Sequence, residues 1–115
     1  MASLLVYCLD DEPDLLELFV EAFSNDKVTV KPFLTTDSAF KAINDKRPDL
    51  ILIDYRLHGT TGDKFAMTID PTIKKALITG ELTVKLQCHF DAVFFKPFKI
   101  EEIEKFIQDT LRSQK

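Results

Sequence analysis

"LILIDYRLHGTTG", residues Leu50 to Gly62, is the stretch that decides the fold. An apolar run leads directly into an aspartate, Asp54, and a loop with two glycines follows at once. An unbroken apolar run is typical of a strand that is covered on both faces of a sheet. A carboxylate at the tip of such a strand can be a turn residue, a metal ligand, a nucleophile or a helix cap. The rest of the chain has to distinguish between these roles.

Length and charge limit the class of protein. The chain has 115 residues, and we expect one domain over residues 1–115, because single domains are commonly of this size. Fifteen basic residues against nineteen acidic ones give a formal net charge of −4, which argues against direct nucleic acid binding by this chain. No run approaches the roughly 20 apolar residues of a membrane span, so we expect no membrane contact.

The cysteines and the N-terminus indicate a compartment. Cys8 lies inside an apolar run, so we expect Cys8 and Cys88 to be free thiols of a reducing environment. The N-terminus has no basic start, and its apolar part is too short for a secretory signal. Both observations favour a cytoplasmic location.

Five short apolar runs alternate with helical patterns along the chain. The runs are Leu4–Leu9, Val28–Phe33, Leu50–Asp54, Ala76–Thr79 and Ala92–Phe95. Helical patterns follow them over residues 11–26, 35–49, 62–71, 81–90 and 99–115. The pattern over 81–90 is weak because Thr83 and Val84 are β-branched, so we expect that helix to be short. This alternation predicts an α/β fold, a doubly wound five-stranded parallel sheet with helices on both faces.

Polar side chains stand where four of the predicted strands end. Asp10 and Asp11 follow the first strand, Asp54 ends the third, Thr79 ends the fourth and Lys96 follows the fifth. The carboxyl ends of parallel strands meet at one edge of the sheet, where ligands of such folds bind. Each residue alone has a simpler interpretation as a helix cap, a turn residue or a solvated lysine. Their common position makes a shared site the better hypothesis.

The residue types of this site favour phosphoryl chemistry. Three neighbouring carboxylates repel one another unless a cation lies between them, and oxygen ligands with open positions favour Mg²⁺. A lysine and a hydroxyl group can position and neutralise a phosphoryl group. Aspartate can form an acyl phosphate, and Asp54 is central in the predicted sheet. We therefore predict that Asp54 is the nucleophile.

Four motifs resemble those of the receiver domain of two-component response regulators. They are "LDDE" (9–12), "ILIDYRLHGTTG" (51–62), "ITG" (78–80) and "FFKPF" (94–98), and they occur in the family's order. The resemblance implies the flavodoxin-like strand order 2-1-3-4-5. It implies a phosphoacceptor signalling domain that is not an enzyme, and whose partner is a sensor histidine kinase or a phosphotransfer protein.

The resemblance also implies roles for individual residues. Asp54 accepts the phosphoryl group, while Thr79 and Lys96 contact its oxygens. The Mg²⁺ ligands are Asp10, acting through water, together with Asp11, Asp54 and the backbone carbonyl of Arg56. The Lys96–Pro97 bond is expected to be cis. A downstream protein, or a second copy in a homodimer, is expected to bind the face made by the fourth helix, the fifth strand and the fifth helix.

Two departures from the family leave alternatives open. His58 stands where the family often has proline, and Val93 stands where an aromatic residue usually couples to the threonine. The departure at Val93 leaves open a degenerate receiver that binds partners without phosphorylation, whereas His58 is expected to be an exposed loop residue or a pH sensor. An aspartyl phosphatase would need a second acid where Arg56 stands. A DNA-binding regulator would need an output domain, so we expect either a lone receiver or a fragment of a larger regulator.

Overall fold

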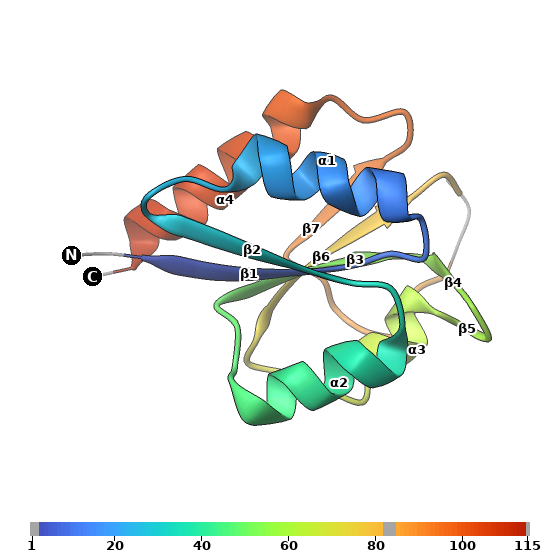
Figure 1. Ribbon diagram of the computed structural model, residues 1–115. Helices are drawn as coiled ribbons and strands as arrows, with labels where there is room; N and C mark the ends of the chain where they lie inside the picture. The colour runs from blue at the N-terminus through green and yellow to red at the C-terminus, as the bar shows by residue number, and fades with distance from the viewer. Residues whose placement is uncertain (1–2, 82–84, 115) are drawn as a thin grey trace.

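A five-stranded parallel sheet organises the computed structural model, which describes residues 3–81 and 85–114 (Figure 1). Its strands are β1 (Leu4–Leu9), β2 (Val28–Phe33), β3 (Leu50–Asp54), β6 (Lys74–Thr79) and β7 (Ala92–Phe95). They lie in the order β2-β1-β3-β6-β7, which is the predicted order 2-1-3-4-5. Within the described residues, no helix is long and apolar enough to cross a membrane.

The strand β6 begins two residues before the predicted start at Ala76. Lys75 interrupts the apolar pattern, yet it is buried within the strand. Its Nζ donates to the backbone carbonyls of Asp70, at 3.1 Å, and Ile73, at 2.8 Å. These bonds compensate for the loss of hydration, so a lysine is accommodated where an apolar side chain was expected.

Four helices within the described residues cover the two faces of the sheet. They are α1 (Pro13–Phe23), α2 (Thr36–Asp45), α3 (Gly62–Ala66) and α4 (Ile100–Ser113). Helices α1 and α4 lie on one face, and α2 and α3 lie on the other (Figure 1). Pro13 occupies the first turn of α1, where its missing N–H costs no hydrogen bond. The predicted doubly wound α/β architecture is confirmed.

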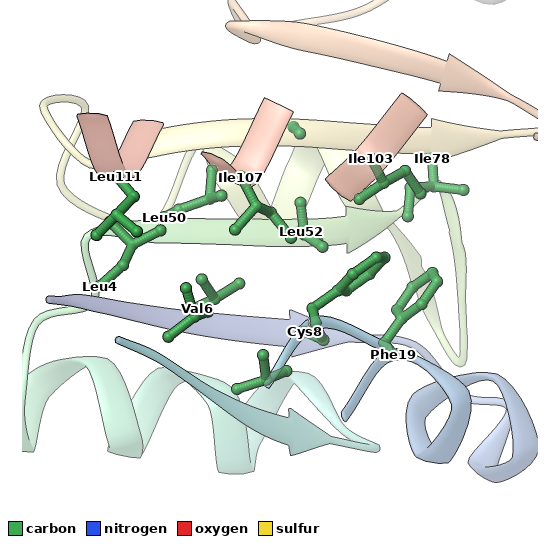
Figure 2. Packing of buried hydrophobic residues seen from close by; sticks show 14 of the residues in the cluster. Leu4, Val6, Cys8, Phe19, Leu50, Leu52, Ile78, Ile103, Ile107 and Leu111 are labelled. Atoms are coloured by element: carbon green, nitrogen blue, oxygen red, sulfur yellow. The ribbon is translucent and has the colours of Figure 1, made fainter. Parts of the chain in front are cut away.

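The central strand β3 has an unbroken apolar sequence because both of its faces are covered by helices. Leu50 and Leu52 pack in the cluster beneath α1 and α4, whereas Ile51 and Ile53 pack in the cluster beneath α2 and α3. Figure 2 shows the first cluster, with Leu52 lying opposite Ile107 of α4. Because successive side chains point to opposite faces, a strand that is covered on both sides must be apolar throughout.

The helix predicted over residues 81–90 is wrong for its described part. Residues 85–90 are not helical, and residues 82–84 lie outside the described ranges. Leu86 and Phe90 instead pack against the cluster beneath α2 and α3. The apolar spacing that suggested a helix therefore serves an irregular segment that covers the sheet directly.

A small antiparallel hairpin follows Asp54 and was not predicted. Its strands are β4 (Arg56–Leu57) and β5 (Thr60–Thr61), and they are joined through His58 and Gly59. Gly59 has φ of 80°, a conformation that costs glycine little and other residues more. Two-residue hairpin loops commonly need such a glycine, which explains its position here.

The outer strand β2 carries a proline, Pro32, opposite Cys8 of β1. Proline lacks an N–H group and is confined to edge strands or bulges within sheets. Its presence agrees with the observed place of β2 at one edge of the sheet.

We predict that Gly62→Ala destabilises the protein by about 1–3 kcal/mol, the usual range for overpacking. A Cβ atom at Gly62 would lie 2.4 Å from the backbone oxygen of Asp54 and 2.9 Å from Cγ2 of Ile53. Denaturant unfolding measures the change. The matched control is Gly80→Ala, since its Cβ would meet nothing closer than 3.9 Å. Equal stability of the two variants would contradict the packing argument.

Candidate functional site

The carboxyl edge of the sheet gathers the predicted site residues. Asp10 directly follows β1, Asp54 ends β3, Thr79 ends β6 and Lys96 directly follows β7. Asp10, Asp54 and Thr79 are buried, while Lys96 is about one-third exposed. The rigid strands thus hold four polar groups from distant parts of the sequence at one place.

Asp10, Asp11 and Asp54 form an acidic cluster. Each offers a carboxylate oxygen, and these oxygens all lie within 4.8 Å of one another. The Oδ1 atom of Asp10 accepts a hydrogen bond from the N–H of Glu12, at 2.9 Å. Its Oδ2 atom is buried and has no partner among the described residues. A buried carboxylate oxygen without a partner is costly, and a hard cation such as Mg²⁺ would satisfy it. The cluster therefore fits a magnesium site of the kind typical of receivers.

Lys96 balances the charge of this cluster. Its Nζ lies 3.0 Å from Oδ1 of Asp54. Burial by itself lowers the pKa of Lys96, but its hydrogen bond with Asp54 and the charge of Asp54 outweigh this and raise its pKa. Burial raises the pKa of Asp54, although Lys96 opposes that rise. Burial also raises the pKa of Asp10 to about 6, and the charge of Asp54 adds to the effect.

The hydroxyl group of Thr79 lies at the end of β6 and accepts a hydrogen bond from the N–H of Glu81, at 3.0 Å. The backbone carbonyl of Thr79 accepts one from the N–H of Lys96, at 2.8 Å. Thr79 and Lys96 are thus tied together at this edge. Because this hydroxyl group bonds the backbone N–H of Glu81, a new partner for the hydroxyl would free that N–H and alter the backbone that follows β6.

An ion pair between Arg56 and Glu81 joins the two loops beside the site. The Arg56 side chain is 74% exposed, so the pair lies at the surface. Its guanidinium also lies 5.9 Å from the ring centre of Tyr55. The backbone of Arg56 begins β4, and its role as a metal ligand stays a prediction.

The two departures from the family take different positions. Val93 packs against the cluster beneath α2 and α3, while Phe94 packs against Phe106 of α4, with ring centres 5.7 Å apart. Val93 and Phe94 thus lie on opposite faces of the sheet, so the ring of Phe94 does not replace the aromatic residue that the family usually has at position 93. His58 is exposed in the hairpin loop.

Sequence reasoning missed Asp63, which is only 2% exposed. Its Oδ1 accepts from the hydroxyl of Thr61, at 2.6 Å, and its Oδ2 accepts from the N–H of Gln87, at 3.1 Å. An acidic residue just after "TTG" indicates the first turn of a helix. No local pattern reveals its second partner, which lies 24 positions away.

We predict that Asp10→Asn stabilises the metal-free protein at pH 7.5 and reduces stabilisation by Mg²⁺. The raised pKa means that the folded state binds more protons than the unfolded state between about pH 4 and pH 6. Metal-free stability therefore falls as pH rises through this window, and the variant lacks that loss. Thermal unfolding at pH 5 and 7.5, with and without Mg²⁺, measures both effects. Asp14→Asn, at an exposed position, is the control. A variant less stable than the parent at pH 7.5 without Mg²⁺ would refute the argument.

Comparison with known proteins places this geometry in a family. A family model described as the response regulator receiver domain matches residues 6–108. The phosphate regulon transcriptional regulatory protein PhoB of Pseudomonas aeruginosa is 29% identical over 122 residues, covering 97% of this chain and 53% of PhoB. The chain therefore spans about half the length of the curated relative that it matches.

Solved structures share the fold. The signal receiver domain of an HD domain-containing protein from Pseudomonas fluorescens Pf-5 has a TM-score of 0.85 at 16% identity, covering 97% of this chain and 89% of that one. A CheY-like receiver domain protein from Methanospirillum hungatei JF-1 has a TM-score of 0.85 at 21% identity, covering 98% and 97%. The chemotaxis regulator CheY4 of Vibrio cholerae has a TM-score of 0.83 at 18% identity, covering 95% and 99%. With the acidic cluster at its expected edge, the chain belongs to the response regulator receiver domain family of two-component signalling.

Proposed function

We propose that this chain accepts a phosphoryl group on Asp54 from a phosphohistidine of a sensor histidine kinase or phosphotransfer protein. The observation that carries the proposal is the pairing of buried Asp54 with Lys96 beside two further carboxylates. Family membership makes the chain a signalling domain and implies a histidine kinase partner. We further propose that residues 1–115 form one receiver domain. We also propose that this domain acts in the cytoplasm.

The transfer forms an acyl phosphate. A carboxylate oxygen of Asp54 attacks phosphorus, the bond from phosphorus to the donor nitrogen breaks, and the donor imidazole leaves with the electron pair. Asp10, Asp11, Asp54 and the carbonyl of Arg56 would hold Mg²⁺. When bound, the ion would neutralise part of the negative charge of the carboxylates and of the incoming phosphoryl group. The transfer and the later hydrolysis of the acyl phosphate, in which water takes the phosphoryl group as inorganic phosphate and frees the carboxylate, are the domain's own chemistry. The chain therefore acts as a signalling domain and not as an enzyme on a separate substrate.

Lys96 and Thr79 then form contacts with the phosphoryl group on Asp54. The ammonium group of Lys96 moves from the carboxylate to a phosphoryl oxygen, and the hydroxyl of Thr79 donates to another. Phosphorylation adds about −1.5 to −2 charges, so both contacts differ between the two states. The change reaches β7, α4 and residues 85–91, and this surface would bind the downstream partner or a second copy.

A degenerate receiver is the second candidate. Val93 and the irregular course of residues 85–90 favour it, because both alter the region that conveys the signal in the family. In that case the chain would bind its partner equally well with and without phosphorylation.

We predict that incubation with Mg²⁺ and acetyl phosphate adds one labile phosphoryl group to the protein. Asp54→Asn should carry none, because it lacks the attacking carboxylate oxygen. Intact-mass spectrometry measures the adduct, and chelation of Mg²⁺ should abolish it. Asp49→Asn, an exposed aspartate at the opposite end of β3, is the control and should be labelled as the parent is. An adduct that persists in Asp54→Asn, or its absence from the parent with every phosphodonor, would refute the proposal.

We predict that Arg56→Ala shortens the lifetime of the adduct several-fold, because we expect the ion pair with Glu81 to limit the access of water to the acyl phosphate. Stability should change by less than about 1 kcal/mol, as is usual for exposed pairs. The decay of the adduct by intact mass and denaturant unfolding measure the two effects. Arg47→Ala removes an exposed pair with Asp70 and is the control. Equal adduct lifetimes in the two variants would contradict this role.

A further inference from the structure

The carboxylate of Asp63 is buried, and within the described ranges no lysine or arginine forms an ion pair with it. A buried charge is costly unless hydrogen bonds satisfy it. Two donors meet this need, and they come from different parts of the chain: the hydroxyl of Thr61 bonds one oxygen, and the N–H of Gln87 bonds the other. The bond from Thr61 is local to the start of α3, whereas the bond from Gln87 reaches a segment 24 positions away and is not needed to begin a helix.

The first donor belongs to the loop that follows the phosphoacceptor. Thr61 ends the hairpin, and the N–H of Gly62 donates to the carbonyl of Tyr55, at 2.7 Å. The close approach of Gly62 to the backbone oxygen of Asp54 leaves no room for a Cβ atom. Gly62 therefore lies directly against the backbone of Asp54, and a displacement of that backbone would move its neighbours Thr61 and Asp63.

The second donor belongs to the segment 85–91, which precedes β7. The thiol of Cys88 also donates to the backbone carbonyl of Asp63, with sulfur and oxygen 3.7 Å apart. In the part of the chain that the structure describes, every hydrogen bond between residues 55–63 and residues 85–91 involves Asp63. At its other end the segment is tied to β6, where Asp91 accepts from the N–H of Lys75.

We propose that Asp63 is a positioning residue that couples the phosphoacceptor loop to residues 85–91. The proposal rests on the phosphorylation of Asp54 proposed above. Each oxygen of the carboxylate serves one side, so a shift of Thr61 and Gly62 reorients the group and alters its bond to Gln87. Residues 85–91 thereby respond to phosphorylation of Asp54 through the hydrogen bonds of Asp63, in addition to any response through Thr79.

The first test needs no phosphorylation. Asp63→Ala removes both acceptors, and the backbone amide of Gln87 should exchange its hydrogen about tenfold faster or more. Asp63→Asn can still accept from Gln87 and donate to the hydroxyl of Thr61, so it should restore protection to near the parent value. Hydrogen exchange measured by NMR reads both. If Gln87 is protected equally in Asp63→Ala, the contact does not position the segment and the proposal is wrong.

The second test isolates the coupling. Thr61→Val keeps the shape of the side chain but cuts only the hydrogen bond on the phosphoacceptor side. After treatment with Mg²⁺ and acetyl phosphate, the amide signals of Gln87 and Cys88 should shift less than half as far as in the parent, at an equal adduct by intact mass. Asp91→Asn, which perturbs only the other end of the segment, is the control and should keep the parent's shift.

The outcomes separate the two proposals. An adduct with the full parental shift in Thr61→Val would overturn the coupling while leaving the phosphorylation of Asp54 intact. Absence of an adduct from the parent would overturn the proposed function, and the coupling would fall with it. If Asp63→Ala does not fold, Thr61→Val still decides the coupling, since it retains the buried carboxylate and its bond to Gln87.

Discussion

The ion pair between Lys96 and Asp54 is the interaction on which the site depends. Burial raises the pKa of both Asp10 and Asp54, which means that two neighbouring negative charges are energetically unfavourable at this edge of the sheet. The positive charge of Lys96 offsets part of this unfavourable free energy, and the charge of Mg²⁺ is suited to offset the rest. The pair forms only if β3 and β7 end at the same edge with β6 between them. The parallel sheet and its crossovers meet this geometric demand.

Much of the fold and site followed from the sequence because each depends on a local pattern. Strands covered on both faces require unbroken apolar runs, and parallel strands bring their ends together, which predicted Asp10, Asp11, Asp54, Thr79 and Lys96 at one edge. The helix predicted over residues 81–90 is wrong for residues 85–90, because Leu86 and Phe90 have helical spacing but cover the sheet directly. Asp63 was missed because a distant backbone N–H defines its role.

The loop after Asp54 meets two requirements at once. It must turn tightly enough for Gly62 to lie against the strand end, and it must present Asp63 to a segment far along the chain. Meanwhile Val93 provides no ring beside the threonine, and Phe94 faces α4. Among the described residues, the hydrogen bonds of Asp63 are the polar contacts that join the loop after Asp54 to the segment that precedes β7.

Pro32 makes the two borders of the sheet unequal. A strand from another polypeptide that approached β2 would find one hydrogen-bond donor fewer, which discourages addition there and the aggregation that open borders invite. The opposite border is β7, where Phe95 is 47% exposed. Of the two borders, β7 is therefore the one without a proline, and Lys96 directly follows it.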